Sequence, residues 1–549
     1  MVRWLYGSVN TMKLQIKTNT LENWRGFFER HAVLILFVGL SVVSILNFII
    51  YYQNGLGLVY NDARSHLDIG RRIVENLKPG FGQIGSVWLP LPHLLMLFTI
   101  WNDFMWHSGL SGALQSMAAF VFTGILIYQF LKRIGAGLFG RIAGVLLFAT
   151  NINILYMQST AMTELLLLGT MTAGAYELLM WHKDEALSRL IKSAFWIMLS
   201  TMIRYDGWFL FLFAMLLIFI RTIRKGYKTT EGVLLMFATL GGFGIILWLL
   251  WNQMIFDDPL FFAFGPYSAN AQQKVLEAGG SLATKHNLPL SIQSYLYALT
   301  YNAGLFTSLL GFAGMIMIWL DKRIKPVIRI ATTVLLAPFF FNVLALYLGH
   351  SVLHVQTREG GSWFNVRYGL MMIPSIAIFS GYLLDRVKSL RLILVSLLIF
   401  ISVFTFANRD AVTIDDGIFG YSGKNVQEVS GWLHDNAYDK PGFVLISAAA
   451  HDSIIFSSGL PMSKFIHEGT GVYWELATAH PERWVRWVVV RTNDKNDSAA
   501  RLLNKNKSLK ENYRRVHSYP FADIYELKPE FLDQLHTERD PRVDELNKK

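Results

Sequence analysis

The feature that most constrains this chain is a series of apolar runs, each about as long as a membrane is thick. A helix needs about 20 apolar residues to cross the hydrocarbon core of a bilayer. The run 190–220 is too long for one span and is interrupted by Arg204-Tyr205-Asp206-Gly207, so we expect two short helices, 190–203 and 207–220, that meet at this polar tip. Further spans are expected at 32–51, 111–131, 139–155, 161–181, 231–252, 298–320, 327–349, 368–385 and 390–407. The sequence therefore predicts a polytopic α-helical membrane protein with about 11 transmembrane helices.

The composition supports this interpretation. Only 16% of the 549 residues are charged, whereas soluble domains usually carry about a quarter. A net charge of +11 would suggest nucleic acid as the partner of a soluble protein, but here the basic residues lie mostly between apolar runs. We therefore expect membrane lipids and no nucleic acid as partners. The chain has no cysteine, which excludes disulfide bonds.

Lysine and arginine counts predict the orientation. They are enriched in residues 1–31 and in alternate loops, and the intervening loops are poor in them. By the positive-inside rule the N-terminal segment 1–31 is cytoplasmic. The transmembrane domain is then 32–407, with a first outer loop at 52–110. We expect the protein to lie in a prokaryotic plasma membrane, and its first apolar run lacks the small-residue cleavage site of a signal peptide.

The C-terminal part, 408–549, has a different character. Short apolar runs such as Phe443–Ala448 and Trp487–Val490 alternate with the helix-like stretches Lys424–Asn436 and Asp497–Asn506. We expect a soluble α/β domain, extracytoplasmic because the number of crossings is odd, with a frayed end at 535–549. His451, Asp452, His467, Glu468 and Trp474 could bind a ligand there, although the pattern favours ordinary loop residues.

The first long polar interruption of the apolar runs is the amphipathic stretch 60–93, which follows the first span. It begins with Asp62 and continues with a pattern that predicts a helix with one apolar face lying in the membrane interface. Asp62 or Asn61 could simply cap this helix. A carboxylate held rigidly at a helix start can also act in catalysis.

Other charged residues stand at the outer ends of apolar runs, where charge is costly and often functional. Glu164 begins a Leu-rich span, and the alternative is that it only complements the helix dipole. Arg204 and Asp206 lie at the tip between two short helices, where a local ion pair would explain both. Arg367 stands where the chain re-enters the membrane, and it could serve as an interfacial anchor. We expect these groups to converge on the outer surface, where guanidinium groups suit a lipid-linked phosphate.

His350 and His354 are four residues apart, so both would lie on one face of a helix. This spacing is compatible with metal binding, but a third ligand is missing. The sequence contains no Walker, GxGxxG or HExxH motif and no internal repeat.

At this point the sequence resembles the glycosyltransferase C superfamily, in the group that includes protein O-mannosyltransferases and aminoarabinose transferases. The likeness covers about 30–385. The motifs that carry it are Tyr60-Asn-Asp-Ala-Arg64, Trp88-Leu-Pro-Leu-Pro-His93, Thr163-Glu164-Leu-Leu, Arg204-Tyr-Asp-Gly-Trp208 and Asn365-Val-Arg-Tyr-Gly369, followed by Pro374. Many members carry two adjacent acids in the first loop, whereas this chain has Asn61-Asp62, which weighs against a metal-dependent mechanism.

The resemblance implies transfer of a monosaccharide, with inversion, from a polyprenyl-phosphate donor to an acceptor hydroxyl on a protein, lipid or glycan. It implies Asp62 as the catalytic base, with Glu164 positioning the acceptor, orienting Arg204 or, together with Asp62, holding a divalent cation. Donor phosphate binding would involve Arg204, Arg367 and His93. Further substrate contacts are expected from Trp88, Tyr205, Asp206, Tyr267, Trp363 and Tyr368. The alternatives are a transferase or polymerase for lipid-linked oligosaccharides and a lipid-linked glycan flippase, for which the absence of repeats is unfavourable.

Overall fold

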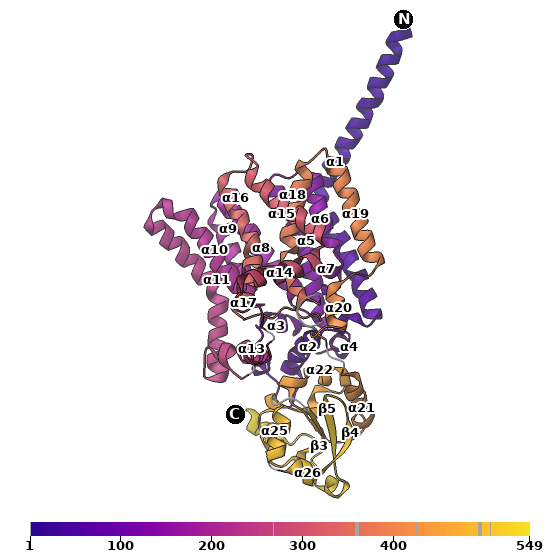
Figure 1. Ribbon diagram of the computed structural model, residues 1–549, viewed down its shortest axis with the longest axis vertical. Coiled ribbons are helices and arrows are strands. Elements are labelled where there is room, and N and C mark those ends of the chain that lie inside the picture. Colours follow the sequence, from indigo (N-terminus) through magenta and orange to yellow (C-terminus); the bar gives the residue numbers. More distant parts are fainter. Residues whose placement is uncertain are drawn as a thin grey trace.

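The computed structural model describes the backbone of residues 2–266, 268–280, 282–356, 362–423, 426–491, 497–505 and 507–548. It consists of a helical bundle with a smaller α/β domain at one end, and the N-terminal helix projects from the other end (Figure 1). The polar loop that follows the first helix lies between the bundle and the α/β domain, as the labels α2, α4 and α22 show (Figure 1).

A helix lies over every apolar run predicted to span the membrane. The helices of the bundle are α1 (Val2–Gln53), α5 (Leu110–Arg133), α6 (Leu138–Ala149), α7 (Ile152–Met157), α8 (Glu164–Asp184), α9 (Leu187–Thr201), α10 (Asp206–Thr222), α11 (Tyr227–Phe256), α14 (Leu288–Ala303), α15 (Leu305–Leu320), α16 (Pro326–Thr332), α17 (Ala337–Tyr347), α18 (Ile373–Arg386) and α19 (Arg391–Ala407). Within the described ranges, seven helices are long and apolar enough to cross a membrane, or eight if one bent pair is counted as a span. The chain is thus an integral membrane protein.

Two breaks in the bundle can be compared with the sequence. The predicted polar tip in 190–220 is confirmed, because α9 ends at Thr201 and α10 begins at Asp206. A Cβ on Gly207 would lie 2.3 Å from the Ser200 backbone, so only glycine allows the two helices to approach this closely. The run 298–320, predicted as one span, does not form one continuous helix. The chain bends by 109° between α14 and α15, at Gly304, whose φ of 81° suits glycine.

The first loop forms α2 (Asn61–Val74), the 3₁₀ turn η2 (Phe81–Ile84), α3 (Leu91–Met96) and α4 (Asp103–His107). Helix α2 confirms the helix predicted after Tyr60, but ten of its residues are buried, and these include polar residues as well as the apolar face. It packs against the α/β domain through α22 (Ala448–Ser458). Tyr60 is the N-cap residue and makes no side-chain cap, so the expectation that Asn61 or Asp62 caps this helix is wrong.

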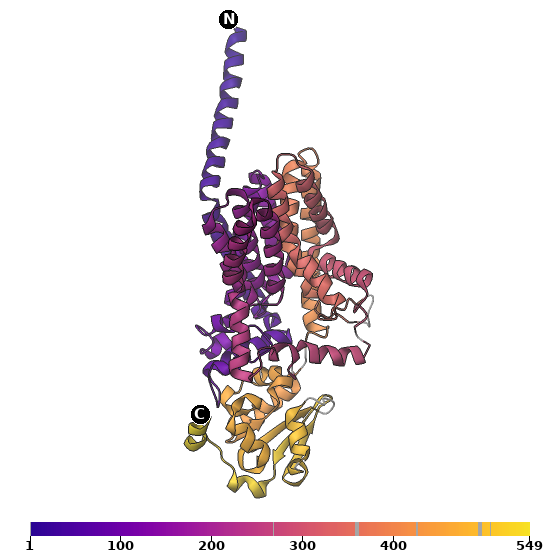
Figure 2. The same cartoon turned by 90° about the vertical axis from the view of Figure 1, so that its left-hand side faces the viewer.

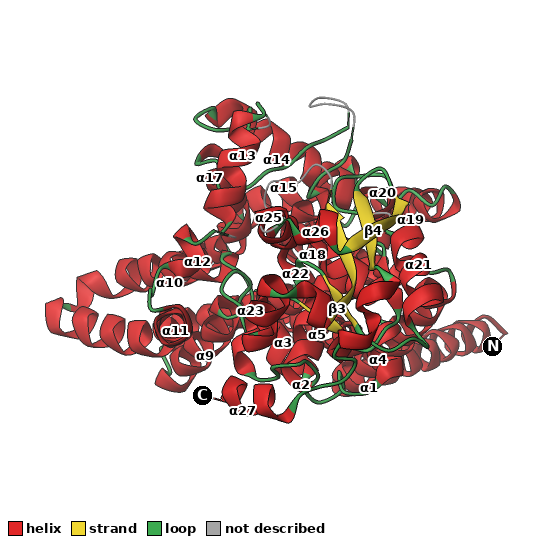
Figure 3. Cartoon of the chain, turned by 90° about the horizontal axis from the view of Figure 1, so that it is seen from below, coloured by secondary structure: helices red, strands yellow, loops and turns green. Residues whose placement is uncertain are grey.

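The α/β domain contains a five-stranded sheet in the order β2-β1-β3-β5-β4. Figure 3 draws the strands of this sheet in yellow. Strand β1 (Phe443–Leu445) pairs in parallel with β2 (Phe465–Ile466) and with β3 (Val485–Arg491). Strand β5 (Ala522–Leu527) pairs antiparallel with β3 and with β4 (Tyr513–Ser518). Its helices are α21 (Gln427–Ala437), α22, α23 (Val472–Ala479), α24 (Pro481–Trp484), α25 (Ser498–Lys505), α26 (Ser508–Glu511) and α27 (Pro541–Lys548). The predicted strands at 443–448 and 487–490 correspond to β1 and β3.

Two segments of the C-terminal region differ from simple expectation. The predicted frayed end is wrong: α27 packs on α23, with Tyr473 donating to Asp544 at 2.8 Å and the Val472 amide donating to Asn547 at 2.8 Å. Helix α20 (Val412–Ile418), directly after the last span, packs against α7 and against the 3₁₀ segment η5 (Val366–Met372) of the bundle. Side chains from α20 therefore reach the end of the bundle, where the charged residues of the earlier segments lie.

Two further helices, α12 (Phe261–Phe264) and α13 (Ala269–Ala278), follow α11 and project beside the bundle end that carries the α/β domain (Figure 2).

Candidate active site between the bundle and the C-terminal domain

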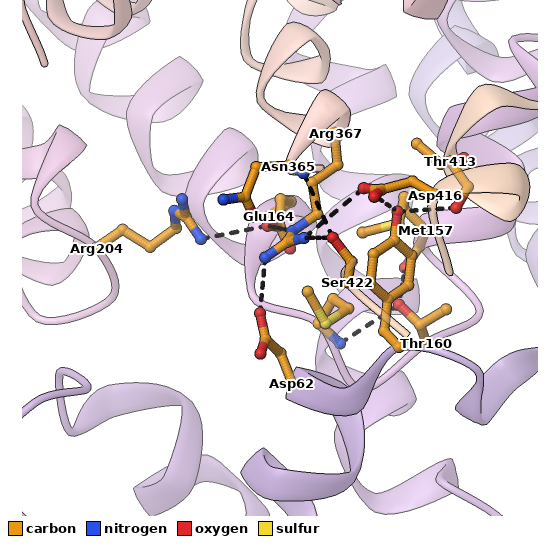
Figure 4. Close-up of polar contacts among 12 residues, drawn as sticks. Asp62, Met157, Thr160, Glu164, Arg204, Asn365, Arg367, Thr413, Asp416 and Ser422 are labelled. Atoms are coloured by element: carbon orange, nitrogen blue, oxygen red, sulfur yellow. Dashed lines mark hydrogen bonds and ion pairs between the residues drawn. The ribbon is translucent and has the colours of Figure 1, made fainter. Parts of the chain in front are cut away.

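Arg367 lies at the centre of a cluster of carboxylates from distant segments (Figure 4). Its Nη2 donates to Oδ2 of Asp62 at 2.7 Å, and its Nε donates to Oε1 of Glu164 at 3.1 Å. On the third side Nη1 donates to the Ser422 hydroxyl at 3.1 Å and lies 3.9 Å from Oδ2 of Asp416. The site thus joins α2, α8, η5, α20 and the loop after α20.

Local structure explains why these groups meet. Glu164 is the first residue of α8, where the helix dipole favours a carboxylate. Arg367 follows Asn365, which adopts a left-handed conformation at φ 56° and donates from its side chain to the Val352 carbonyl at 2.9 Å. Asparagine tolerates this conformation better than most residues, so the turn into η5 is stable and aims Arg367 at the bundle end.

Arg204 extends the cluster on the other side of Glu164. Its Nη1 donates to Oε1 of Glu164 at 3.2 Å, and its Nε donates to Oδ2 of Asp206 at 3.3 Å. The local pair with Asp206 that the sequence suggested is therefore present, but it is one link of a longer network. Both guanidinium groups lie over the ring of Tyr368, at 5.3 and 5.5 Å from its centroid.

Exposure separates the members of this network. Side chains of Glu164 and Arg367 are 0% and 4% exposed, whereas those of Asp62 and Arg204 are 35% and 21% exposed. Glu164 also keeps a buried oxygen, Oε2, that has no hydrogen-bond partner among the described residues. The accessible groups are thus one carboxylate and one guanidinium, and both are held by buried partners.

Three residues of this site were not predicted from the sequence: Asp416, Ser422 and Tyr60. The Tyr60 hydroxyl bonds the Thr413 carbonyl at 2.8 Å and Oδ2 of Asp416 at 3.1 Å, and the tyrosine ring faces Arg367 at 5.1 Å. Asp416 is fully buried. The available signal was the pair Asp415-Asp416 shortly after the last span, but such a pair is common in the polar sequence of a soluble domain.

A buried histidine pair lies beside the network. His66, one helical turn after Asp62 on α2, bonds through Nδ1 to Nε2 of His93 at 2.9 Å, and its ring lies 4.2 Å from that of Trp88. Burial, and then the charges of Arg204 and Arg367, lower the pKa of His66 to about 3. Burial likewise lowers the pKa of His93. His93 was predicted to bind phosphate. In the structure it contacts His66, a residue that was not predicted from the sequence.

The remaining predicted substrate residues have different positions. The Tyr205 hydroxyl donates to the Val87 carbonyl at 3.2 Å, so this residue fixes the segment that carries Trp88. Trp363 packs edge-on against Tyr301, with ring centroids 5.0 Å apart. Tyr267 lies outside the described residues. In the C-terminal domain Glu468 accepts from the Ala448 amide at 2.9 Å, so it caps α22.

The expectation that His350 and His354 share a helix face is wrong. Helix α17 ends at Tyr347, and His354 pairs with Phe364 in an isolated β-bridge. In the part of the chain that the structure describes, no three histidine, cysteine, aspartate or glutamate side chains are arranged to hold a metal ion. The suggested ligands Asp62 and Glu164 are both engaged with Arg367, so the donor set does not fit a divalent cation.

Comparison with known proteins gives a clear answer for the fold alone. No protein-family model and no curated protein sequence matches the chain. Among solved structures, ArnT from Cupriavidus metallidurans bound to undecaprenyl phosphate is similar with a TM-score of 0.56 and 10% identity, over 91% of this chain and 99% of that one. Its apo structure gives 0.55 and 11%, over 92% and 99%. The chain therefore has the fold of these two ArnT structures, in agreement with the resemblance that its sequence motifs showed.

Proposed function

We propose that the protein is an inverting glycosyltransferase that moves a monosaccharide from a polyprenyl-phosphate donor to an acceptor hydroxyl. The observation that carries this proposal is Asp62, the partly exposed carboxylate of an otherwise buried network at the end of the membrane helices. The undecaprenyl phosphate bound by a protein of similar fold supports a polyprenyl carrier. The basic loops support an extracytoplasmic site with the N-terminus in the cytoplasm.

Asp62 would act as the general base. The acceptor hydroxyl attacks the anomeric carbon from the face opposite the phosphate, its proton passes to the Asp62 carboxylate, and the bond between the anomeric carbon and the phosphate oxygen breaks. The products are the glycosylated acceptor and polyprenyl phosphate. Arg367 holds Asp62 at 2.7 Å, which fixes the carboxylate for this proton transfer.

Arg204 is the better candidate for the leaving phosphate. All three nitrogens of Arg367 already contact side chains, from Asp62, Glu164 and Ser422. Arg204 is more exposed, and among the described residues its Nε is engaged by Asp206 and its Nη1 by Glu164, which leaves Nη2 for a substrate. A guanidinium that is held by carboxylates and still reaches the substrate is suited to stabilise charge that develops on the leaving phosphate. Trp88, whose ring lies beside His66, and Tyr368, over which Arg204 lies, would contact the sugar or its phosphate.

The test uses the full chain, purified in lipid, with polyprenyl-phosphate-linked sugars and a panel of acceptors. The Asp62→Asn variant should lose at least about 100-fold in transfer rate, as expected for loss of a general base, while donor binding stays close to normal. Full activity of this variant would exclude Asp62 as the base. If the wild type transferred only oligosaccharides, a lipid-linked oligosaccharide transferase would be the correct assignment, whereas movement of lipid-linked glycan without transfer would indicate a flippase.

A further inference from the structure

We infer that Arg367 is a built-in cation of the active site, occupying the position that a divalent metal would need in a site with this many carboxylates. The inference rests on the proposed function and assigns Arg367 a positioning role. It makes the transfer reaction independent of divalent metal ions. It also means that the three carboxylates around Arg367 keep their positions only while a planar guanidinium lies among them.

Three carboxylates lie around the single guanidinium group of Arg367. Asp62, Glu164 and Asp416 lie within 4 Å of three different nitrogens of Arg367, at 2.7, 3.1 and 3.9 Å. Two of these acids, Glu164 and Asp416, are fully buried. Burying several carboxylates together is costly unless a cation compensates for the loss of hydration. Arg367 is the cation that contacts all three.

The planar shape of the guanidinium group also fits the arrangement of these carboxylates. A guanidinium presents donors on three sides of a plane, and each side here faces a different segment of the chain. Carboxylates arranged around such a plane are farther apart than the ligands of a metal ion, which require oxygens at about 2.0–2.6 Å from one centre. This agrees with the finding that no group of three acidic or histidine side chains in the described ranges can hold a metal.

Two tyrosine rings support the guanidinium group of Arg367. The guanidinium carbon of Arg367 lies over the rings of Tyr60 and Tyr368, at 5.1 and 5.5 Å from their centroids. Tyr60 in turn donates to Asp416, the acid on the Nη1 side. Aromatic faces on a guanidinium fix its plane by cation–π attraction. The carboxylates therefore balance the charge of Arg367, and the two rings fix its position. Its removal should leave a cavity that a free guanidinium ion fits.

Chemical rescue tests this. In Arg367→Ala, transfer should fall by at least about 100-fold, because Asp62 loses its fixed partner. Millimolar methylguanidinium should raise the transfer rate of this variant by at least about tenfold and should also raise its Tm. Mg²⁺, Mn²⁺ and methylammonium should change neither the rate nor the Tm. Wild-type transfer should be unchanged by EDTA. Arg367→Lys should show low kcat with nearly normal donor KM, since a point charge cannot hold three acids.

The matched control is Arg386→Ala. Arg386 lies at the other end of the bundle, where it also contacts two carboxylates, Asp321 at 3.2 Å and Asp385 at 3.9 Å. Its loss should leave transfer per folded molecule within about twofold of the wild type, and methylguanidinium should not increase that activity.

The possible outcomes separate the two hypotheses. Loss of wild-type transfer in EDTA with recovery in Mg²⁺ or Mn²⁺, or rescue of Arg367→Ala by these metals and not by methylguanidinium, would overturn the inference and leave the glycosyltransferase intact. If the wild type transferred no sugar from any donor, the proposed function would fail. The Tm response of Arg367→Ala to methylguanidinium would then still decide whether a guanidinium-shaped cation site exists.

Discussion

Asp62 and Glu164 illustrate how two carboxylates on one guanidinium can have different tasks. Asp62 is partly exposed and can reach a substrate, whereas Glu164 is fully buried and bridges Arg204 and Arg367 through a single oxygen, Oε1. Removing the charge of Glu164 leaves two adjacent guanidinium groups without their shared counter-charge. Its contribution is therefore to hold the two arginines together against their mutual repulsion.

Replacement of Glu164 by Gln keeps an oxygen at the bridging position but removes the charge. We expect Glu164→Gln to lower kcat/KM by about 100-fold and the free energy of unfolding by about 1.5–3 kcal/mol, because hydrogen bonds to charged groups are worth this much. The control is Glu177→Gln on the same helix, α8, where Glu177 pairs with Arg189 at 3.0 Å away from the site. Enzyme kinetics and Tm would be measured side by side, and equal losses in kcat/KM would remove the bridging role.

Part of this site could be predicted from the sequence, and part could not. Asp62, Glu164, Arg204 and Arg367 stand at the ends of apolar runs, where an isolated charge is costly and therefore informative. Asp416 lies in a polar region after the last span, where acids are common and carry no such signal. Its position depends on α20 packing against the bundle, a long-range contact that no local pattern in the sequence specifies.

Helices of this bundle were predictable where the apolar runs were uniform, and breaks within them were less so. The tip at 204–206 interrupts its run with charges, and it was predicted. Gly304 interrupts its run without any charge, and glycine is frequent in membrane helices that do not break. The 109° bend between α14 and α15 was missed for this reason, since its cause is a backbone conformation at one glycine and not a change in polarity.

Close packing of α15 on α18 gives a prediction at this scale. A Cβ on Gly314 would lie 2.0 Å from the Phe379 carbonyl oxygen, and backbone atoms cannot yield as a flexible side chain can. We expect Gly314→Ala to destabilise the protein by about 1–3 kcal/mol, as overpacking usually does. A lower Tm and increased protease sensitivity in lipid nanodiscs would report this.

Gly39→Ala is the matched control for that substitution. Gly39 lies within the long helix α1, and a Cβ added there meets no atom within 4 Å. Its effect should be neutral or slightly stabilising, because alanine is the better helix former by up to about 1 kcal/mol. A Gly314→Ala variant as stable as Gly39→Ala would show that α15 and α18 can separate without cost.

At the scale of the whole molecule, the first loop is enclosed between two bodies. Gln83 donates to the Gly469 carbonyl at 2.6 Å, and Arg64 donates to the Ser457 hydroxyl at 3.1 Å, both from the loop to the α/β domain. Leu77 is buried in the apolar core of that domain. The domain therefore covers α2, the helix that carries Asp62, and helps to fix its position over the bundle end.

This enclosure buries histidines that are solvated in an unfolded chain. Burial lowers the pKa of His66 to about 3, with a further contribution from Arg204 and Arg367, and it lowers the pKa of His93 and His467 well below the usual value. In the unfolded chain a histidine has a pKa of about 6.5. Below that pH the unfolded state binds more protons than the folded state, so stability falls as the pH falls.

We therefore expect the Tm to be nearly constant from pH 8 to 7 and to fall steadily from about pH 6.5 towards pH 4. The slope arises because each neutral buried histidine costs up to about 1.4 kcal/mol per pH unit below 6.5. Replacing His66, His93 and His467 one at a time by Gln should make the decline shallower, even where the substitution lowers the Tm at pH 7.5. His480, which is 63% exposed, is the control, and His480→Gln should leave the slope unchanged. A decline of equal slope in all four variants would mean that groups other than His66, His93 and His467 set the acid sensitivity of the protein.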